Sequence, residues 1–452
     1  VLFRDGLADR DYLEKYTAGA AELEAHLASR TPEWAAEITS IPVEEIEAFA
    51  KLYGANKRSY LRLGFGFTRS RNGAVQMFSA SCLPAVTGAW QHPGGGALYS
   101  HGAIYGIDKT LIEGHDVCDT KVRVLDQSRI GPILTGDPRD LGDGPPVTAL
   151  FIQNTNPMNV APDLGKVRAG FGRDDLFVCV HEQFMTETAE MADIVLPATT
   201  FLEHDDFYVA GGHTHLQVTR AVIEPVGEAR SNHDVLCALA RRLGASHPGF
   251  DMDAWGLMDE TLRRSGYSGA EAVWEGHWDD RAQAFDEAHF IDGFGHPNGK
   301  FHFAPDWSKI GGNHNGMPRL PDHDANIDNR DDDHPYRLVT APSRNYLNTS
   351  FTETATSQAR EGRPEAQIHP DICAELGLAA GGLVRIGNTQ GSVVVHVRPT
   401  EGMRRGTVVV ESVWPNRAFV EGIGINLLIS ADAGRPNGGA VFHDTAVWLR
   451  GA

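Results

Sequence analysis

The sequence has few cysteines, and no two of them are spaced as a metal-binding pair. The chain has five cysteines and contains no CxxC, which argues against a cysteine-built iron–sulfur or zinc site within it. Their odd number and partly apolar surroundings also give no sign of a disulfide framework. They are Cys82, Cys118, Cys179, Cys237 and Cys373.

Long apolar runs and excess positive charge are missing too. No run approaches about 18 apolar residues, so the sequence predicts no membrane span. The net charge of −20 argues against nucleic acid and against an anionic membrane surface as partners. The 452 residues should form two or three domains. Because the sequence begins at Val1 without a methionine or a signal peptide, we expect a fragment or a processed chain.

A strand–helix–strand pattern lies near the middle of the chain. The apolar run Leu176–Val180 predicts a strand that is covered on both faces. His181–Gln183 follows as a polar bend, Thr186 is a plausible helix N-cap, and Asp193–Pro197 predicts the next strand, closed by proline. So short a unit is typical of an open α/β sheet, in which nucleotides bind at the carboxyl ends of the strands.

A second polar loop follows a second buried-strand pattern just upstream. Val147–Ile152 predicts the strand and Gln153–Pro157 the loop. Side-chain amides and backbone N–H groups in such a loop can bind phosphate or a purine edge. An ordinary Asn/Pro turn is the alternative, and it would be the preferred one if this loop stood alone. The presence of two such loops on neighbouring strands favours binding.

The N-terminal segment is predicted to be helical as far as residue 54. Thr31 is expected to cap one helix, and a second helix should run from Val43 to Tyr53 and end at Gly54. We interpret this segment as a connector without chemistry.

A glycine-containing loop follows the predicted strand Tyr60–Leu63. Gly64 and Gly66 allow close approach of the backbone to a ligand, and Arg69 could bind a pyrophosphate. The third glycine of a dinucleotide fingerprint is misplaced, so a solvated basic turn is the alternative. His213 and His215 should share one face of a strand, but they lack a third metal ligand at a recognisable spacing.

The C-terminal part changes to short β-runs. A short helix capped near His369 is followed by strands at Leu383–Ile386, Ser392–Val397 and Thr407–Val413, with a turn at Gln390 and Gly391. This rhythm of strands and glycine turns predicts a β-barrel of the double-psi kind.

Taken in order, these motifs resemble the molybdopterin oxidoreductase family, which includes formate dehydrogenases, nitrate reductases and dimethyl sulfoxide reductases. The resemblance rests on Gln153–Pro157, Glu182–Thr188, Ala192–Pro197 and Glu203, which match an N-P loop, a T-E-T loop, A-D-x-x-L-P and a following glutamate. The last segment is similar to the C-terminal barrel of that family, in which a loop after the first strand and a late asparagine contact the pterin cofactor.

The resemblance implies a set of cofactor-binding residues, although it assigns no catalytic residue. They are Gly64, Gly66, Arg69, Gln153, Asn154, Asn156, Pro157, Glu182, Gln183, Thr186, Asp193, Thr340, Ser343, Arg344, Asn348, Thr349 and Asn426.

Roles follow from the same resemblance for some members of this set. Asn154 and Asn156 are expected near phosphate or ribose, and Glu182 or Gln183 near ribose or guanine. Asp193 is expected to be a structural or guanine-facing acid. The family often has T-G-R where this chain has Thr340 to Arg344, which leaves open whether Ser343 or Arg344 contacts the cofactor.

The implied fold is α/β, with an open parallel-sheet nucleotide-binding domain followed by a C-terminal double-psi-type β-barrel. Residues 1–55 would be a helical connector from a preceding domain, 56–290 the α/β dinucleotide-binding domain, 291–335 a linker and 336–452 the barrel. The implied cofactor is bis-molybdopterin guanine dinucleotide with molybdenum or tungsten. A 4Fe-4S cluster and the protein ligand of the metal belong to an earlier part of family members, which this sequence does not include.

The implied function is two-electron oxidation or reduction, or oxygen-atom transfer, on a small molecule such as formate, nitrate or an S- or N-oxide. A redox partner protein or an electron-transfer subunit would complete the reaction. Similarity leans towards bacterial members close to formate dehydrogenases, and the expected compartment is the cytoplasm, with the periplasm as an alternative. Two other functions stay open: a cofactor-free scaffold related to the large subunit of respiratory complex I, and a nucleotide-binding module without redox activity. The intact asparagine- and threonine-rich loops favour the enzyme.

Overall fold

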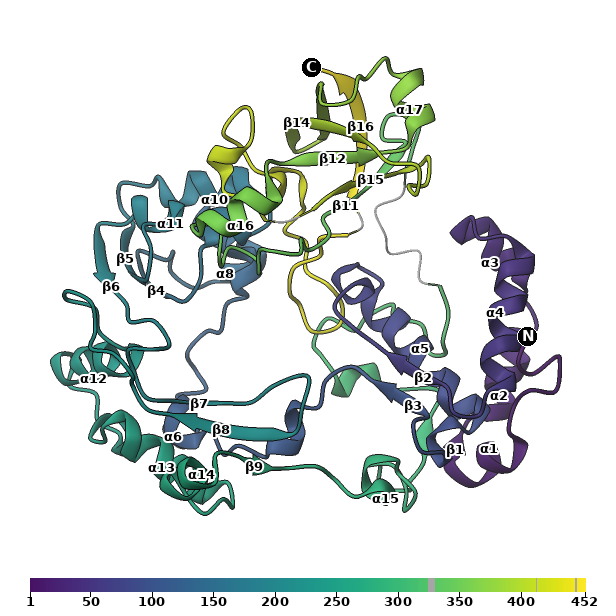
Figure 1. Cartoon of the computed structure of the whole chain (residues 1–452), viewed down its shortest axis with the longest axis horizontal. Helices are drawn as coiled ribbons and strands as arrows, with labels where there is room; N and C mark the ends of the chain where they lie inside the picture. The colour runs from purple at the N-terminus through teal and green to yellow at the C-terminus, as the bar shows by residue number, and fades with distance from the viewer. Residues whose placement is uncertain (324–329, 412, 444) are drawn as a thin grey trace. The chain divides into compact units, whose positions relative to one another are not determined.

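The computed structural model describes residues 1–323, 330–411, 413–443 and 445–452, and the chain forms two compact units (Figure 1). Unit 1 comprises Val1–His101, Ala282–Ile327 and Gly434–Gly438, and unit 2 comprises Gly102–Arg281, Asp328–Ala433 and Gly439–Ala452. The predicted linker and the predicted strand Thr407–Val413 both include residues outside the described ranges. The predicted domain limits at residues 55, 290 and 335 stay a prediction, because these units are defined by contacts.

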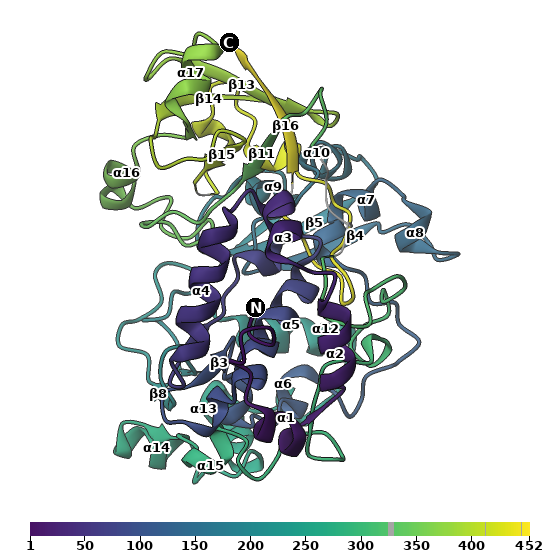
Figure 2. The ribbon, with the colours of Figure 1, turned by 90° about the vertical axis from the view of Figure 1, so that its right-hand side faces the viewer.

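Unit 1 is mainly helical, and Figure 2 brings its N-terminal helices to the front. Leu13, Leu23, Tyr53 and Phe303 are buried together in its core. Two short parallel strand pairs complete it, β1 with β10 and β2 with β3. Its elements are α1 (Arg10–Tyr16), β1 (Thr17–Ala18), α2 (Ala20–Leu27), α3 (Pro32–Thr39), α4 (Val43–Ala55), β2 (Tyr60–Arg62), η1 (Phe67–Arg69), α5 (Gly73–Thr87), η2 (Ala89–Gln91), β3 (Gly96–Leu98), α15 (Phe285–Ala288), β10 (Phe301–His302) and η6 (Trp307–Lys309).

Two helix-end predictions in unit 1 have different outcomes. Thr31 caps α3 as predicted, and its side chain accepts a hydrogen bond from the backbone N–H of Trp34. The predicted stop at Gly54 is wrong, because α4 continues through it to Ala55. A Cβ at Gly54 would lie 2.7 Å from a methyl group of Leu2 and 2.8 Å from the Cβ of Leu7. Gly54 is therefore used for close packing rather than for ending the helix.

Unit 2 contains a parallel sheet with the order β4 (Ala149–Gln153), β5 (Phe177–Glu182), β6 (Ile194–Pro197). Its covered face packs Ile152, Val178 and Val180 against helices that include α7 (Ile130–Leu134) and α10 (Leu164–Phe171). The expectation that both faces are covered is wrong. Phe151, Phe177 and Ile194 on the other face are 39%, 48% and 45% exposed, although parallel sheets are usually buried on both sides.

A small antiparallel sheet, also in unit 2, packs on helices at the end of the α/β region. Leu216 and Val218 of its central strand are buried with Tyr105 and Leu262. This strand begins at His215, so His213 lies before it and the two histidines do not share a strand face as predicted. The elements are β7 (Asp206–Tyr208), β8 (His215–Thr219), β9 (Asp279–Asp280), η3 (Gly102–Tyr105), α6 (Thr110–Glu113), α13 (Ala254–Arg264) and α14 (Ala270–Gly276).

A closed barrel near the C-terminus confirms the predicted β-barrel and the α/β-plus-barrel fold class. Alternate residues of its strands point inward and form a valine- and isoleucine-rich core, because side chains of a strand alternate between its faces. Around the barrel the strands are β11 (Tyr336–Val339), β15 (Thr407–Val410), β12 (Glu365–Ile368), β14 (Gly391–Pro399), β13 (Leu383–Asn388) and β16 (Thr445–Gly451).

The remaining elements of unit 2 are short, apart from α12. They are η4 (Gln127–Arg129), α8 (Pro138–Leu141), α9 (Pro157–Val160), α11 (Glu187–Glu190), α12 (Asn232–Leu243), η5 (Pro248–Phe250), α16 (Ala355–Glu361), α17 (Pro370–Glu375), η7 (Asn416–Ala418) and η8 (Ile425–Leu428). Among the described residues, no helix is both long and apolar enough to cross a bilayer.

Candidate functional site

The two predicted binding loops begin at the same edge of the parallel sheet. Gln153 at the end of β4 lies beside His181 of β5, and Glu182 at the end of β5 lies beside Pro197 of β6. Since the carboxyl ends of parallel strands form one edge, the loops after β4 and β5 are neighbours. The structure therefore brings together the predicted residues of these two loops, from Gln153 to Pro157 and from Glu182 to Thr186.

Asp193 lies at the opposite edge from these loops. It directly precedes β6, and its Oδ2 accepts a 2.7 Å hydrogen bond from the backbone N–H of Val178, near the start of β5. Asp193 thus joins the amino ends of two strands. Of its two expected roles, this position supports the structural one.

A buried histidine holds Gln153 in place. His181 is fully buried, and its Nε2 lies 3.0 Å from the backbone carbonyl oxygen of Arg230. Because a carbonyl oxygen only accepts, Nε2 carries the proton, and Nδ1 accepts from the Gln153 amide at 2.9 Å. This bond fixes the amide nitrogen of Gln153 and leaves its carbonyl oxygen for other contacts.

Asn156 turns inward and ties the two loops together. Its Oδ1 accepts from the Thr188 hydroxyl at 2.6 Å and from the Thr188 backbone N–H at 3.3 Å. The Thr188 hydroxyl oxygen in turn accepts from the backbone N–H of Met158 at 3.0 Å. Pro157 is buried at the first position of α9. Asn156 and Pro157 therefore shape the loop, and Asn156 does not present its side-chain oxygen to a ligand.

The T-E-T sequence after β5 is used in three directions. Thr186 caps α11 as predicted, accepting from the Ala189 backbone N–H at 3.2 Å. Glu187 accepts from the Asn416 side-chain amide at 2.6 Å and from the Arg417 backbone N–H at 3.3 Å. Thr188 bonds to the loop after β4, as described above. The motif thus connects the start of α11, the loop after β4 and residues 416–428, which contain η7 and η8 and are called the barrel segment below.

Two buried asparagines of the barrel segment complete this contact. Asn416 donates to the Met158 carbonyl oxygen at 2.9 Å and accepts from the Gly424 N–H at 2.7 Å. Asn426 donates to the Asn159 carbonyl oxygen at 2.8 Å. Both residues are only 3% exposed, so these hydrogen bonds are shielded from water. Each contributes more to stability in this buried position than it would at the surface. The late asparagine predicted to bind cofactor is therefore occupied in docking the barrel segment.

Glu182 has the most unusual environment at the sheet edge. Burial raises the pKa of its carboxyl group above the ordinary value, and the nearby Glu353 raises it further. The backbone N–H of Gln183 donates to Glu182 at 2.7 Å and opposes that rise in pKa. The side chain of Gln183 donates to the Thr199 carbonyl oxygen at 3.0 Å. The other carboxylate oxygen of Glu182 accepts no hydrogen bond from the described residues and is available to a ligand.

The exposed polar residues of the edge and barrel loops differ from the inward-turned ones. Asn154 and Asn348 are exposed and have left-handed backbones, with φ of 58° and 51°. Arg344 is exposed, and its guanidinium forms no ion pair within the described part of the chain. Ser343 accepts from the backbone N–H of Tyr346 at 3.3 Å. Ser343 therefore stabilises a turn, whereas Arg344 is open to a ligand.

Thr340 and Thr349 lie at the two ends of the loop after β11. The Thr340 hydroxyl donates to the Phe442 carbonyl oxygen at 3.2 Å, and the carbonyl oxygen of Thr349 accepts from the Thr352 hydroxyl at 2.8 Å. Between these two threonines, the backbone N–H of Asn345 donates to the Glu361 side chain at 2.6 Å. The loop is consequently fixed at several points.

Gly64, Gly66 and Arg69 belong to unit 1. Both glycines have open space where a Cβ would stand, so close approach of a ligand is sterically possible there. Arg69 is exposed, and its guanidinium carbon lies 5.7 Å from the centre of the Phe65 ring.

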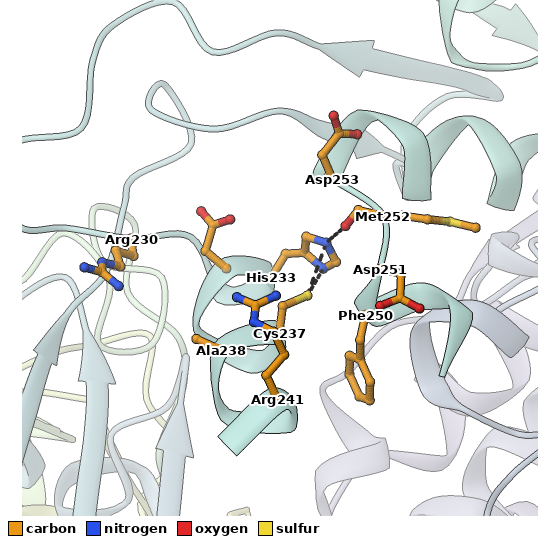
Figure 3. Close-up of a pocket in the computed structure, with 10 residues that line it drawn as sticks. Arg230, His233, Cys237, Ala238, Arg241, Phe250, Asp251, Met252 and Asp253 are labelled. Atoms are coloured by element: carbon orange, nitrogen blue, oxygen red, sulfur yellow. Dashed lines mark hydrogen bonds between the residues drawn. The ribbon is translucent and has the colours of Figure 1, made fainter. Parts of the chain in front are cut away.

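A separate cavity of about 600 Å³ lies between α12 and the turn that contains η5 (Figure 3). The sulfur of Cys237 lies 3.5 Å and 3.7 Å from the two ring nitrogens of His233, whose Nε2 lies 2.8 Å from the Met252 carbonyl oxygen. Burial raises the pKa of the Cys237 thiol, which keeps it protonated and unreactive. Across the described ranges, no three His, Cys, Asp or Glu side chains are grouped to hold a metal. We therefore assign no chemistry to this cavity.

Asn416, Glu187 and Thr188 were not among the predicted site residues. Glu187 and Thr188 lie inside the T-E-T motif, so the motif was the available signal for them. Asn416 follows Trp414 and Pro415 without any recognisable pattern, and nothing in the sequence marks its partner 229 residues away.

Known proteins match the chain along most of its length. The family described as molybdopterin oxidoreductase matches residues 47–242, and the one described as molydopterin dinucleotide binding domain matches residues 336–446. A probable oxidoreductase of Bacillus subtilis, YoaE, is 32% identical over 99% of this chain and 65% of its own length. The trimethylamine-N-oxide reductase of Haemophilus influenzae is 27% identical over 91% of this chain and 57% of its own length.

A solved structure supports the fold. Acetylene hydratase from Pelobacter acetylenicus matches with a TM-score of 0.80 and 17% identity, over 100% of this chain and 69% of that chain. The chain spans 65% and 57% of the lengths of the two curated relatives named above.

The two family matches follow one another along the chain. The first includes the parallel sheet, and the second includes the barrel, which Asn416 and Asn426 connect to the loop after β4. The chain belongs to the molybdopterin oxidoreductase family.

Proposed function

We propose that this chain holds part of a molybdopterin guanine dinucleotide cofactor and serves a molybdenum or tungsten oxidoreductase. The observation that carries the proposal is the junction between the segments matched by the two families. The loops of the parallel sheet and the barrel segment meet through Asn416 and Asn426. A dinucleotide cofactor spans a long distance, so a site made of two joined modules suits it.

The residues at this edge fit such a group. Glu182 offers a partly buried carboxylate with a raised pKa, which suits a base edge that donates hydrogen bonds, as guanine does. Asn154 offers an exposed amide beside backbone N–H groups, which suits phosphate or ribose. Arg344 and Asn348 on the barrel loop are exposed, and Arg344 provides the charge for a phosphate. We propose these four, with Gln153, Gln183 and Thr349, as the residues that contact the cofactor.

The other predicted residues act indirectly in this proposal. Asn156, Thr186 and Asn426 hold the loops and the barrel segment in position. Gly64, Gly66 and Arg69 would meet a second dinucleotide in unit 1. When bound, the cofactor would supply soft sulfur ligands and a metal that changes oxidation state by two electrons.

The substrate class follows from the relatives rather than from a pocket of this chain. Trimethylamine-N-oxide reductase is named among them, so a small S- or N-oxide is the first substrate to test, followed by formate and nitrate. A redox protein or an electron-transfer subunit would exchange electrons with the enzyme. We expect the cytoplasm as its compartment, which fractionation of the native host can check.

Metal and nucleotide analysis of the intact gene product tests the proposal. Molybdenum and tungsten are measured by mass spectrometry, and GMP is measured after acid hydrolysis. About one metal ion and about two GMP per chain would support a bis-dinucleotide enzyme. Protein without metal and without GMP, from a host that makes the cofactor, would overturn the proposal.

A further inference from the structure

We propose that Glu187 is a positioning residue that locks the barrel segment to the parallel sheet and thereby keeps the two halves of the cofactor site together. The inference rests on the proposed function for its cofactor readout. Its structural half stands on the hydrogen bonds of Glu187 alone. Glu187 lies on α11 and touches none of the exposed residues proposed to contact the cofactor.

The contacts of Glu187 require a carboxylate. Its Oε2 accepts from the Asn416 side-chain nitrogen at 2.6 Å, and its Oε1 accepts from the backbone N–H of Arg417 at 3.3 Å. Both partners are donors, so both oxygens of residue 187 must be acceptors. A glutamine has the same shape but places an N–H₂ group against one of these donors. The substitution therefore tests the hydrogen-bond polarity without changing the volume.

Asn416 cannot rotate to relieve that conflict. Its oxygen accepts from the Gly424 N–H at 2.7 Å, and its nitrogen also donates to the Met158 carbonyl oxygen at 2.9 Å. Exchanging oxygen and nitrogen would place a donor against Gly424 and an acceptor against Met158. The orientation of Asn416 is therefore fixed by three partners, and Glu187 is the one whose polarity can be altered by a single isosteric change.

The same helix connects this contact to the loop after β4. Thr188, the next residue, binds Asn156 through its hydroxyl at 2.6 Å. A shift of Glu187 would therefore disturb two contacts: the hydrogen bond from Thr188 to Asn156 in the loop after β4, and the hydrogen bond from Asn416 in the barrel segment. The exposed groups that would grip the cofactor lie on both sides of this junction, so their spacing depends on it.

The test compares Glu187→Gln with Glu190→Gln in the cofactor-loaded protein. Glu190 lies on the same helix, has a 55% exposed side chain and approaches Arg417 only to 3.9 Å, so its substitution makes the same charge change without breaking the junction. Hydrogen exchange is followed in residues 416–428 and 156–160, and cofactor loss is followed as released GMP over time.

We expect Glu187→Gln to exchange faster in both segments while barrel strands β13 and β14 keep their protection. Cofactor release should be faster by about tenfold or more, as expected for losing a hydrogen bond to a charged group. Glu190→Gln should match the parent protein in both measurements.

Each outcome decides the proposal. Equal exchange in Glu187→Gln and Glu190→Gln would show that the junction does not depend on Glu187. Faster exchange with unchanged GMP release would show that the junction does not hold the cofactor site together. A parent protein without metal or GMP would defeat the proposed function, while the exchange comparison would still decide the structural half. If Glu187→Gln does not fold, Glu187→Asp, which keeps the carboxylate but shortens the side chain, takes its place in the same comparison.

Discussion

Arg129 is the buried cation whose removal should most clearly destabilise unit 2. The residue is 8% exposed, and its guanidinium group forms a bidentate pair with the Asp140 carboxylate, with N–O distances of 2.5 Å and 2.8 Å. A third bond of 2.7 Å reaches the carbonyl oxygen of Ala431. Nearby, Asp126 accepts from the Gly439 N–H at 3.0 Å. Arg129 thus ties the segment before the parallel sheet to the segment that precedes β16.

Replacing Arg129 with methionine keeps most of the side-chain volume and removes the charge. It leaves the Asp140 carboxylate and the Ala431 carbonyl oxygen without their partner in a mostly buried position. Removing one member of a buried pair costs about 3–5 kcal/mol, whereas a single hydrogen bond to a charged group is worth about 1.5–3 kcal/mol. The Asp140 side chain is only 10% exposed, so we expect a loss of about 2–4 kcal/mol, between these two figures, in the free energy of unfolding of unit 2.

Urea unfolding followed by tryptophan fluorescence would measure this loss, because Trp414 and Trp448 of the C-terminal barrel contribute to the signal of the eight tryptophans. Arg139→Met is the matched control: Arg129 and Arg139 both approach the Asp137 carboxylate, at 3.3 Å and 2.7 Å, but the Arg139 side chain is 66% exposed. An exposed pair contributes little, so the control should unfold close to the parent. A loss in Arg129→Met below about 1 kcal/mol, or one equal to the control, would refute the assignment of Arg129 as a buried tie.

Three smaller predictions test other parts of the molecule. Burial raises the pKa of Glu182, so the folded protein loses stability as pH rises from the unfolded value of about 4.3 through the raised pKa. Glu182→Gln should therefore stabilise the cofactor-free protein at pH 7 and not at pH 4, and equal effects at both pH values in urea unfolding would contradict this. Asn426→Ala should cost about 1–3 kcal/mol in the same assay, because it leaves the buried Asn159 carbonyl oxygen unpaired; no change would mean that water replaces the bond. Gly54→Ala should lower the thermal midpoint of unfolding, despite the gain in helix propensity, because the new Cβ would lie 2.7 Å from a methyl group of Leu2. A raised midpoint would show that the N-terminal segment containing Leu2 moves away to make room.

Local signals predicted much of the fold. Thr31 and Thr186 cap helices because a threonine hydroxyl satisfies the free N–H groups of a first turn. The turn before Gly391 joins β13 to β14 as predicted, with Gly391 at a φ of 157°. Gly54 shows the limit of such signals. Whether a glycine ends a helix or makes room for a neighbour depends on Leu2, which is distant in sequence and invisible to a local pattern.

The sequence predicted that the two sheet loops start at one edge, but not the direction of each side chain in them. Asp193 precedes a strand and therefore lies at its amino end, away from the edge that carries the two loops, which favours the structural one of its two predicted roles. The direction of the Asn156 side chain could not be predicted, since it depends on the hydroxyl of Thr188, 32 residues later. Asn416 is harder still, because an isolated asparagine carries no motif and its role depends on tertiary contact alone.

The T-E-T motif suggests how family resemblance and chemistry are related in this chain. Thr186, Glu187 and Thr188 each direct a side chain to another part of the protein: a helix start, the barrel segment and the loop after β4. Because these side chains bond within the protein, the motif can identify the family, but its presence alone does not assign the three residues to cofactor binding. The groups proposed to bind the cofactor are instead exposed, as Asn154 and Arg344 are. Substitutions within the motif should consequently change stability and loop exchange even without cofactor, whereas substitutions of the exposed groups should change only cofactor affinity.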